Sequence, residues 1–199
     1  MFNINLMQSV NFANKKLYCL GNIELLHNNC VAVIGTRQLS RQGLMFGKEV
    51  VTRICNDGFT LVSGLAIGSD TVAHKTATKL NAPQIAVLPS GFKNITPQRN
   101  IALANEILEQ GGLLISEYTP NQRANRNSYL ERNEIVAQIA DIVVVLECSA
   151  QSGTMNTVRH AHKLGKQLLA YLPEESSKHF KTDGSQMIIN SYDGLRMTK

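Results

Sequence analysis

Short apolar runs, each followed by a turn signal and then by a longer segment with apolar positions at helical spacing, repeat along most of the chain. The segment after the first run shows this helical spacing at Leu44, Val51 and Ile54. The runs are apolar throughout instead of alternating, which is typical of strands buried on both faces of a parallel sheet. The pattern therefore predicts an α/β protein with a doubly wound, mostly parallel sheet and an extended Rossmann-like fold. The predicted strands are residues 31–34, 59–62, 85–88, 113–115, 142–146 and 168–172.

The two ends of the chain differ from this repeating middle. Residues 1–30 are amphipathic and irregular, so we expect a helical or looped lead-in that covers one edge of the core. Residues 31–172 carry the alternating pattern and form the predicted core. The chain turns polar beyond Pro173, and residues 173–199 are predicted to be a C-terminal tail or an addition to the sheet edge.

The segment 61–74 is the best candidate for a ligand-binding loop, because an apolar run stops at two glycines and resumes as a helix. Gly64 and Gly68 allow backbone turns where a Cβ would clash, and Ser69 or Asp70 can cap the helix that follows. A helix that begins on such a loop directs unpaired backbone N–H groups at the space above the strand end, which favours an anion. An ordinary connection that needs two glycines for packing is the alternative for this segment.

The residues that follow the predicted strands are mostly small or polar, and in a doubly wound sheet ligands bind at these carboxyl ends. These strand ends are Gly35-Thr36-Arg37, Ser63-Gly64, Pro89-Ser90-Gly91, Ser116-Glu117 and residues 147–154. Arg37 fits either a phosphate or a partner carboxylate, for which Glu117 and Glu147 are the candidates at the strand ends.

Composition narrows the class of protein further. Of 199 residues, 43% are hydrophobic and 18% charged, which argues against a disordered chain. The chain carries 20 basic and 15 acidic residues, and the resulting charge of +5 permits an anionic partner without identifying one. No apolar run approaches the ~20 residues of a membrane span, and no signal sequence is evident, so we expect a cytoplasmic protein. The cysteines are widely spaced and are predicted to be buried reduced thiols; they are Cys19, Cys30, Cys55 and Cys148.

Common catalytic and cofactor signatures are missing from the sequence. His160 and His162 are two apart on a predicted helix and project in different directions, so they cannot share a metal ion. His74 is interpreted as a capping or packing residue, because the nucleophile-elbow motif of hydrolases is absent. The chain has neither GxGxxG nor GxxxxGK[ST], which argues against classical dinucleotide and P-loop nucleotide binding. We predict no cofactor, no metal and no enzymatic activity.

Six motifs in order closely resemble the DNA processing protein A family (DprA/Smf), from about Leu17 to Leu172. The motifs are VIGTR with Ser40 and Gly43, SGLAIGSDTVAH, AVLPSGF followed by Pro97 and Asn100, GGLLISEY, Tyr129 with Arg132-Asn133, and QSGTMNTVRHA. The resemblance implies a Rossmann-like protein that binds single-stranded DNA without base specificity, forms a homodimer, and helps to load the RecA recombinase during natural transformation. We expect no membrane partner, because no apolar run is long enough to span a membrane.

The chain departs from the family's pattern at two positions. The family's common Arg-Asn-Arg is here Arg132-Asn133-Glu134, and a tyrosine usual before the proline of the third loop is Thr96. Glu134 replaces a base by an acid, which bears on one wall of the implied DNA pocket. Many family members also carry further helical domains, and we expect this sequence to be close to a minimal core without a winged-helix domain.

The resemblance and the strand ends together define the candidate binding residues. Tyr129 can be core, or it can stack a base while Arg123, Arg126 and Arg132 hold the backbone, as single-strand binders do. Lys93 and Arg99 extend this basic track or form a solvated surface. The candidate DNA- or phosphate-binding residues are Gly35, Thr36, Arg37, Ser63, Gly64, Gly68, Arg126, Tyr129, Arg132, Asn133, Gln151, Ser152, Gly153 and Thr154.

Two alternatives remain open at this stage. The lysine-decarboxylase-like phosphoribohydrolases, which cleave nucleoside monophosphates, have a PGGxGTxxE motif that resembles Gly153-Thr154. Here Thr157 stands in place of the glutamate and the Pro-Gly-Gly is missing, which argues against this activity. The other alternative is a sensor that holds a free nucleotide in the same pocket.

Overall fold

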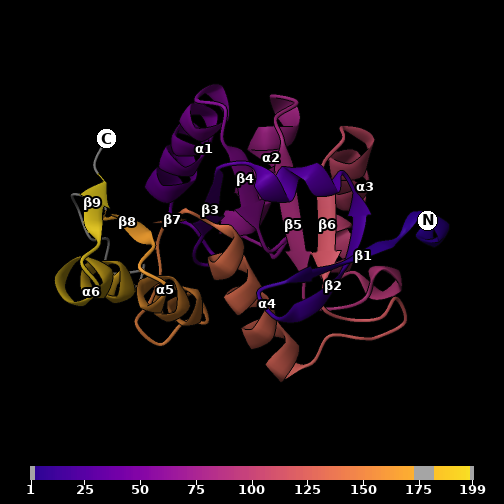
Figure 1. Cartoon of the computed structure of the whole chain (residues 1–199). Helices are drawn as coiled ribbons and strands as arrows, with labels where there is room; N and C mark the ends of the chain where they lie inside the picture. The colour runs from indigo at the N-terminus through magenta and orange to yellow at the C-terminus, as the bar shows by residue number, and fades with distance from the viewer. Residues whose placement is uncertain (1–2, 173–181, 198–199) are drawn as a thin grey trace.

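The computed structural model describes residues 3–172 and 182–197 (Figure 1). In this part of the chain a single nine-stranded sheet has the order β1-β2-β6-β5-β4-β3-β7-β8-β9. The strands are β1 (Gln8–Phe12), β2 (Lys15–Gly21), β3 (Cys30–Ile34), β4 (Thr60–Ser63), β5 (Gln84–Leu88), β6 (Leu113–Ser116), β7 (Ile142–Val145), β8 (Gln167–Tyr171) and β9 (Leu195–Met197). All pairs from β6 through β9 are parallel, which confirms the predicted α/β class and the doubly wound, mostly parallel sheet.

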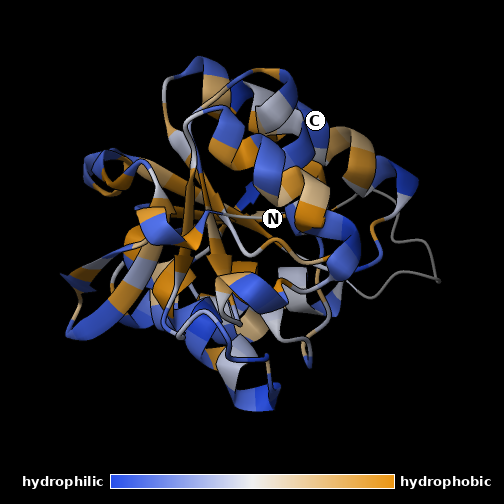
Figure 2. Ribbon diagram, turned by 90° about the vertical axis from the view of Figure 1, so that its right-hand side faces the viewer, coloured by the Kyte–Doolittle hydropathy of each residue, from blue (hydrophilic) through white to orange (hydrophobic). Residues whose placement is uncertain are grey.

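Helices cover both faces of this sheet, because its strands bury side chains on both sides. In β3, Val31 and Val33 pack against α1 and α2, whereas Ala32 and Ile34 pack in the cluster formed with α4 and α5. Figure 2 shows the apolar strands between the two helix layers. The helices are α1 (Arg41–Asn56), α2 (Ser69–Lys79), α3 (Ile101–Glu109), α4 (Arg126–Ile139), α5 (Thr154–Lys163) and α6 (Asp183–Ser191), with short 3₁₀ turns η1 (Ile4–Leu6), η2 (Ile23–His27), η3 (Phe92–Asn94) and η4 (Gln98–Asn100).

The lead-in differs from the helical or looped segment predicted for residues 1–30. β1 and β2 form an antiparallel hairpin, and β2 pairs with β6 so that Tyr18 lies opposite Ser116. The turn uses Ala13 and Asn14, both with positive φ, instead of the Asn-Gly pair that marks such turns in a sequence. Burial of Leu17 and Cys19 on one side of β2 is the alternating strand signal that the sequence analysis missed.

The C-terminal residues that the structure describes add to the opposite edge of the sheet. α6 packs through Ile188 into the same apolar cluster as α4 and α5, and β9 pairs in parallel with β8. Of the predicted tail or edge addition at 173–199, residues 182–197 are therefore an edge addition; residues 173–181, 198 and 199 lie outside the described residues.

The order of the strands determines where a ligand site can form. From β3 the chain moves outward through β4 and β5 to β6, and then crosses to β7 on the other side of β3. The connections from β3 and β7 thus leave toward opposite faces of the sheet, and a crevice opens between their carboxyl ends.

Candidate functional site

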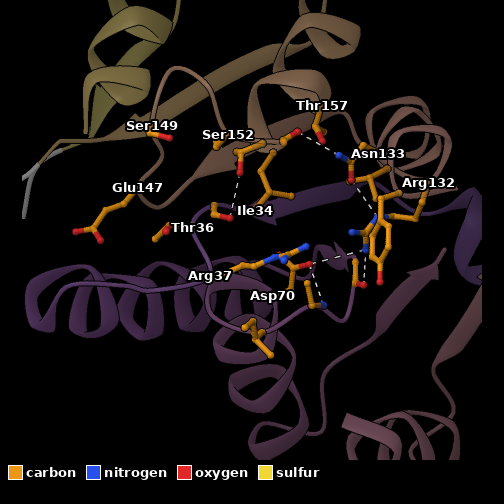
Figure 3. Close-up of a pocket in the computed structure, with 18 of the residues that line it drawn as sticks. Ile34, Thr36, Arg37, Asp70, Arg132, Asn133, Glu147, Ser149, Ser152 and Thr157 are labelled. Atoms are coloured by element: carbon orange, nitrogen blue, oxygen red, sulfur yellow. Dashed lines mark hydrogen bonds and ion pairs between the residues drawn. The ribbon is translucent and has the colours of Figure 1, made fainter. Parts of the chain in front are cut away.

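A cavity of about 520 Å³ lies in this crevice, at the carboxyl ends of β3, β4 and β7 (Figure 3). Its walls come from four separate parts of the chain: the loop after β3, the loop after β4, α4, and the segment between β7 and α5. The residues that line it are Ile34, Gly35, Thr36, Arg37, Gln38, Gly64, Ala66, Ile67, Asp70, Tyr129, Leu130, Arg132, Asn133, Val136, Glu147, Ser149, Ser152, Gly153, Thr154 and Thr157.

The loop after β3 is fixed by backbone contacts on two sides. The Thr36 amide donates to the Glu147 carbonyl at 2.6 Å, and the Thr36 carbonyl accepts from the Ser69 amide at 3.1 Å and the Ser69 hydroxyl at 3.0 Å. The Thr154 hydroxyl donates to the Gly35 carbonyl at 3.1 Å. The start of α2 and the start of α5 therefore hold this loop between them.

The loop after β4 depends on close approaches that only glycine allows. A Cβ on Gly68, whose φ is +81°, would lie 2.3 Å from the Thr36 carbonyl oxygen. The Ala66 amide donates to an Asp70 carboxylate oxygen at 3.1 Å, and the Asn100 side chain donates to the Leu65 carbonyl at 2.8 Å. Gly68 thus positions the pocket loop without lining it.

Arg132 is buried at the inner wall of the cavity, with 7% of its surface exposed. Its guanidinium donates to the carbonyls of Gly64 and Val87, and Nη1 lies 3.9 Å from a carboxylate oxygen of Asp70. Burial lowers the pKa of Arg132, and the nearby Asp70 carboxylate opposes this effect. Arg132 therefore joins α4 to the ends of β4 and β5 and to the start of α2 through Nη1, while its Nε donates to the Asn133 side chain at 3.0 Å.

Glu147 is also buried, and its carboxylate accepts from the Ser40 amide at 2.8 Å and the Ser40 hydroxyl at 2.5 Å. The Ser40 hydroxyl in turn accepts from the Gly43 amide and caps α1. Glu117 lies 3.2 Å from the Lys15 ammonium. Both carboxylates that the sequence offered as partners for Arg37 thus bind other residues.

Arg37 differs from Arg132 in both exposure and pairing. It is exposed, and among the described residues no carboxylate lies within ion-pair distance of it. Figure 3 shows its side chain directed across the cavity toward the side where Asp70 and Arg132 lie. Arg37 is therefore available for an anionic ligand.

The opposite wall combines an aromatic ring with the start of a helix. Tyr129 is half-buried on α4 and lines the cavity. The Asn133 side chain donates to the Gly153 carbonyl at 3.1 Å and so joins α4 to the start of α5. Among the described residues no side chain caps α5, and Gly153 lines the cavity with nothing within 4 Å of where its Cβ would lie. The amides of Met155 and Asn156 already donate to the Ser152 and Gly153 carbonyls.

Four predicted residues lie outside the lining. Ser63 is fully buried and its hydroxyl donates to the Val33 carbonyl at 2.6 Å, while Gly68 supports the loop as described above. Arg126 and Gln151 are exposed beyond the cavity. The other ten predicted residues come together at the cavity, and they are Gly35, Thr36, Arg37, Gly64, Tyr129, Arg132, Asn133, Ser152, Gly153 and Thr154.

Several residues of the site were missed or given another role. Asp70 was predicted as a helix cap and not as a cavity residue, and Asn100 was noted only as part of a motif. Thr157 is 2% exposed and lines the cavity, at the position where the phosphoribohydrolase motif has its glutamate. Apolar lining residues such as Leu130 and Val136 carry no signal in the sequence that separates them from core.

His74 has a structural role in the core. His74 is fully buried, its Nδ1 lies 2.9 Å from the Gln84 side-chain oxygen, and burial lowers its pKa, so it is a packing residue as predicted.

Within residues 3–172 and 182–197 no three His, Cys, Asp or Glu side chains gather closely enough to hold a metal ion. The helices in these ranges are all too short or too polar to cross a bilayer.

Comparison with known proteins gives the family. Residues 5–195 match the family described as DNA recombination-mediator protein A. The chain belongs to this family. Protein Smf of Escherichia coli is 36% identical over 154 residues, which are 77% of this chain and 41% of that protein. DNA processing protein DprA of Streptococcus pneumoniae is 30% identical over 186 residues, or 90% of this chain and 65% of that one. The chain thus spans about two fifths to two thirds of the length of these relatives.

Solved structures of the DNA recombination-mediator protein A family agree with the fold. DNA processing protein A of Helicobacter pylori, studied for its single-stranded DNA binding mode, superposes with a TM-score of 0.86 at 26% identity, over 97% of this chain and 91% of that chain. The S. pneumoniae protein gives a TM-score of 0.84 at 31% identity, over 92% of this chain and 63% of that chain. A molybdenum cofactor binding protein of Rippkaea orientalis shares only the fold, with a TM-score of 0.59 at 18% identity over 86% of this chain and 90% of that chain.

Glu134 stands at the position where the family commonly has an arginine. Glu134 is not part of the cavity lining, and its carboxylate lies 3.2 Å from the Lys15 ammonium. Burial alone would lower the pKa of Lys15, but hydrogen bonds to Glu134 and Glu117 raise it above its usual value. Glu134 therefore attaches α4 to the N-terminal hairpin and forms no wall of the cavity.

Proposed function

We propose that the cavity binds single-stranded DNA through its phosphates and one stacked base, without base specificity and without a chemical step. The observation that carries this proposal is Arg37, an exposed guanidinium at a strand end with no carboxylate partner among the described residues. A guanidinium in this position offers a fork of donors to a phosphate. The H. pylori relative, studied for its single-stranded DNA binding, supports the assignment through its similar fold.

The other walls supply the remaining parts of such a site. The start of α5 places the partial positive charge of a helix N-terminus beside Gly153, although the amides of Met155 and Asn156 already donate to the Ser152 and Gly153 carbonyls. Tyr129 provides a ring on which a base can stack, and stacking tolerates every base because each has a π-face. Phosphate contacts carry no sequence information, so the combination favours binding without base specificity.

The carboxylates of the cavity argue against hydrolysis. Glu147 accepts two hydrogen bonds from Ser40, and Asp70 lies between the Ala66 amide and Arg132. A general base needs a carboxylate that is free to take a substrate proton, and both of these already bind other groups of the protein. Thr157 has no acid–base role at neutral pH, so we propose a binding protein and no enzyme.

The family resemblance adds three proposals at the level of assembly. The protein acts in the cytoplasm, forms a homodimer, and delivers single-stranded DNA to a RecA-type recombinase. Sedimentation of the purified protein tests the dimer. Co-purification with a recombinase in the presence of an oligonucleotide tests the partner.

Fluorescence anisotropy with an unstructured oligonucleotide tests the main proposal. Binding should prefer single-stranded over duplex DNA and should weaken steeply with salt, because each phosphate contact releases counterions. An affinity that does not change with salt, or one equal for duplex DNA, overturns it.

The volume of the cavity favours one second candidate, a free nucleotide as ligand. About 520 Å³ falls within the range of small-molecule sites. A thermal-shift screen with nucleoside monophosphates and adenosine diphosphate ribose distinguishes the two. A large shift together with weak oligonucleotide binding supports a nucleotide sensor, and the reverse supports a DNA binder.

A further inference from the structure

Two loops beside the cavity are joined into one platform. The loop after β5 and the loop after β6 lie side by side near the start of α4 (Figure 1). The Gly91 amide donates to the Gln122 carbonyl at 2.9 Å, the Lys93 amide to the Pro120 carbonyl at 3.0 Å, and the Asn94 side chain to the Asn121 carbonyl at 2.7 Å. A Cβ on Gly91 would lie 1.9 Å from the Thr119 carbonyl oxygen, so the approach requires glycine.

The platform carries positive charge without neighbouring acids in its own segments. Residues 89–100 contain Lys93 and Arg99, residues 118–126 contain Arg123 and Arg126, and neither segment has an Asp or Glu. All four cations are exposed, and among the described residues none of them forms an ion pair. We call these two segments the basic shelf.

Acidic side chains from adjoining elements are already engaged. Glu117 faces Lys15, and Glu131 of α4 accepts from the Tyr118 hydroxyl. The charge of the basic shelf is therefore not neutralised by these two nearest acids in sequence.

The basic shelf is continuous with the cavity at both of its ends. On α4, Arg126, Tyr129 and Asn133 share one helix face because they are three and seven residues apart, and the last two line the cavity. At the other end Asn100 donates to the Leu65 carbonyl and so joins η4 to the loop that lines the cavity. A chain of phosphates that leaves the cavity past Tyr129 meets Arg126 first and Arg123 next.

We propose that the basic shelf is a second contact surface for the phosphate backbone of the same DNA strand that occupies the cavity. This inference rests on the proposed function of the cavity and deepens it, because it assigns a direction to the strand: out of the cavity along α4 toward the loops after β6 and β5. Short oligonucleotides then occupy the cavity alone, and longer ones also contact the basic shelf.

Oligonucleotide length separates the two surfaces experimentally. Anisotropy is measured with oligo(dT) of about 6 nucleotides, which lies within the ~4–16 nucleotides of common single-strand sites, and of about 30 nucleotides, which lies well beyond them. The double variant Lys93→Ala/Arg123→Ala should lose roughly tenfold in affinity for the longer oligonucleotide at low salt, and its salt slope should fall by about 1.4, or about 0.7 for each lost contact. Its affinity for the shorter oligonucleotide should stay that of the wild type.

The control removes the same charge elsewhere. Lys75→Ala/Lys79→Ala changes two exposed lysines of α2 that no described carboxylate pairs with, and it should leave both salt slopes unchanged. Equal losses on both lengths, or a long-oligonucleotide slope that matches the control, overturn the basic shelf. Failure of the wild type to bind the shorter oligonucleotide, or unchanged binding by Arg37→Ala, counts instead against the cavity.

Discussion

The Arg132 guanidinium occupies the space beside Gly64 that a side chain would need. A Cβ on Gly64 would lie 1.6 Å from Nη1 of Arg132, the same nitrogen that donates to the Gly64 carbonyl. The end of β4 and the inner wall of the cavity are thus one packed unit, built on a glycine and a buried cation from 68 residues further along the chain.

The substitution Gly64→Ala tests this relationship. The added methyl group would displace Arg132 from two carbonyls, and we expect the free energy of unfolding to fall by at least about 2 kcal/mol, in the upper half of the range for overpacking. Urea denaturation measures it. The control is Gly153→Ala, whose Cβ would meet nothing within 4 Å and whose φ of −59° suits any residue; it should change stability by less than about 0.5 kcal/mol. Equal losses in the two variants would contradict the packing described here.

Arg37→Ala tests the anion site. Because Arg37 has no carboxylate partner among the described residues, its removal strands no buried charge, and urea denaturation should show an unchanged free energy of unfolding. Oligonucleotide binding should weaken by about 1.5–3 kcal/mol, the range for a hydrogen bond to a charged group. Arg37→Lys should recover only part of this affinity, since it keeps the charge and loses the fork.

Lys48→Ala is a matched control for Arg37, because Lys48 is an exposed cation of α1 away from the cavity lining. Its affinity for the oligonucleotide should stay that of the wild type. Intact binding by Arg37→Ala together with a large fall in stability would refute the phosphate role.

Glu134→Gln tests whether the departure from the family's arginine affects DNA binding. The change removes one partner of Lys15 and leaves the cavity lining intact, so oligonucleotide affinity should not change. Stability should fall by no more than about 1 kcal/mol, because the pair is partly exposed. Anisotropy and urea denaturation of Glu134→Gln beside Glu117→Gln, the other partner of Lys15, check both expectations. A clear gain in affinity for Glu134→Gln alone would show that Glu134 opposes the DNA.

The buried thiols predict a loss of stability at alkaline pH. Burial raises the pKa of the Cys148 thiol to about 12, whereas an unfolded cysteine titrates near ~8.5. Between these values the unfolded chain releases a proton that the folded chain keeps, so the contribution of Cys148 is complete below the lower pKa and is lost as pH rises toward the higher. The loss amounts to at most about 1.4 kcal/mol per pH unit for this thiol.

This contribution is isolated by measuring the free energy of unfolding of the wild type and of Cys148→Ala, both at pH 7.5 and above about pH 9. The variant should show the shallower decline in stability with pH, whatever its stability at pH 7.5. Identical slopes for the two proteins would contradict the assignment of the alkaline loss to Cys148.

The protein should release no free base from nucleoside monophosphates. Thr157 lies in the cavity at the position of the phosphoribohydrolase glutamate, and the two cavity carboxylates are held by Ser40, Ala66 and Arg132. Chromatography after prolonged incubation checks this expectation. Turnover that disappears in Glu147→Gln would contradict it.

The parallel core could be predicted because its strands are apolar on both sides and because apolar residues recur along its helices with the helical period of ~3.6 residues. The N-terminal hairpin was missed because Ala13-Asn14 lacks the usual turn signal, and because its alternation is short. Its pairing with β6 also joins residues about a hundred positions apart, which no local pattern encodes.

The glycines of the candidate site could be predicted from the sequence, but the contacts of its buried side chains could not. Gly35, Gly64 and Gly153 were predicted as site residues because the sequence places them at strand ends and at a helix start, where the backbone turns. Arg126 and Arg132 look alike in the sequence, yet one is exposed and the other is 7% exposed and bound to carbonyls. The inward role of Arg132 depends on the position of Val87 and Gly64 in space, which the spacing along α4 cannot give.

The separation of the cavity walls along the chain has a consequence for synthesis on the ribosome. β3 and its loop are made early, but the neighbour that completes them, β7 with the Thr154 segment, follows more than a hundred residues later. A nascent chain that ends before α4 leaves one side of β3 as an open edge and has only half of the cavity. Such a chain presents Arg37 without Tyr129 or the start of α5, so the DNA binding proposed here requires nearly the whole core to have left the ribosome.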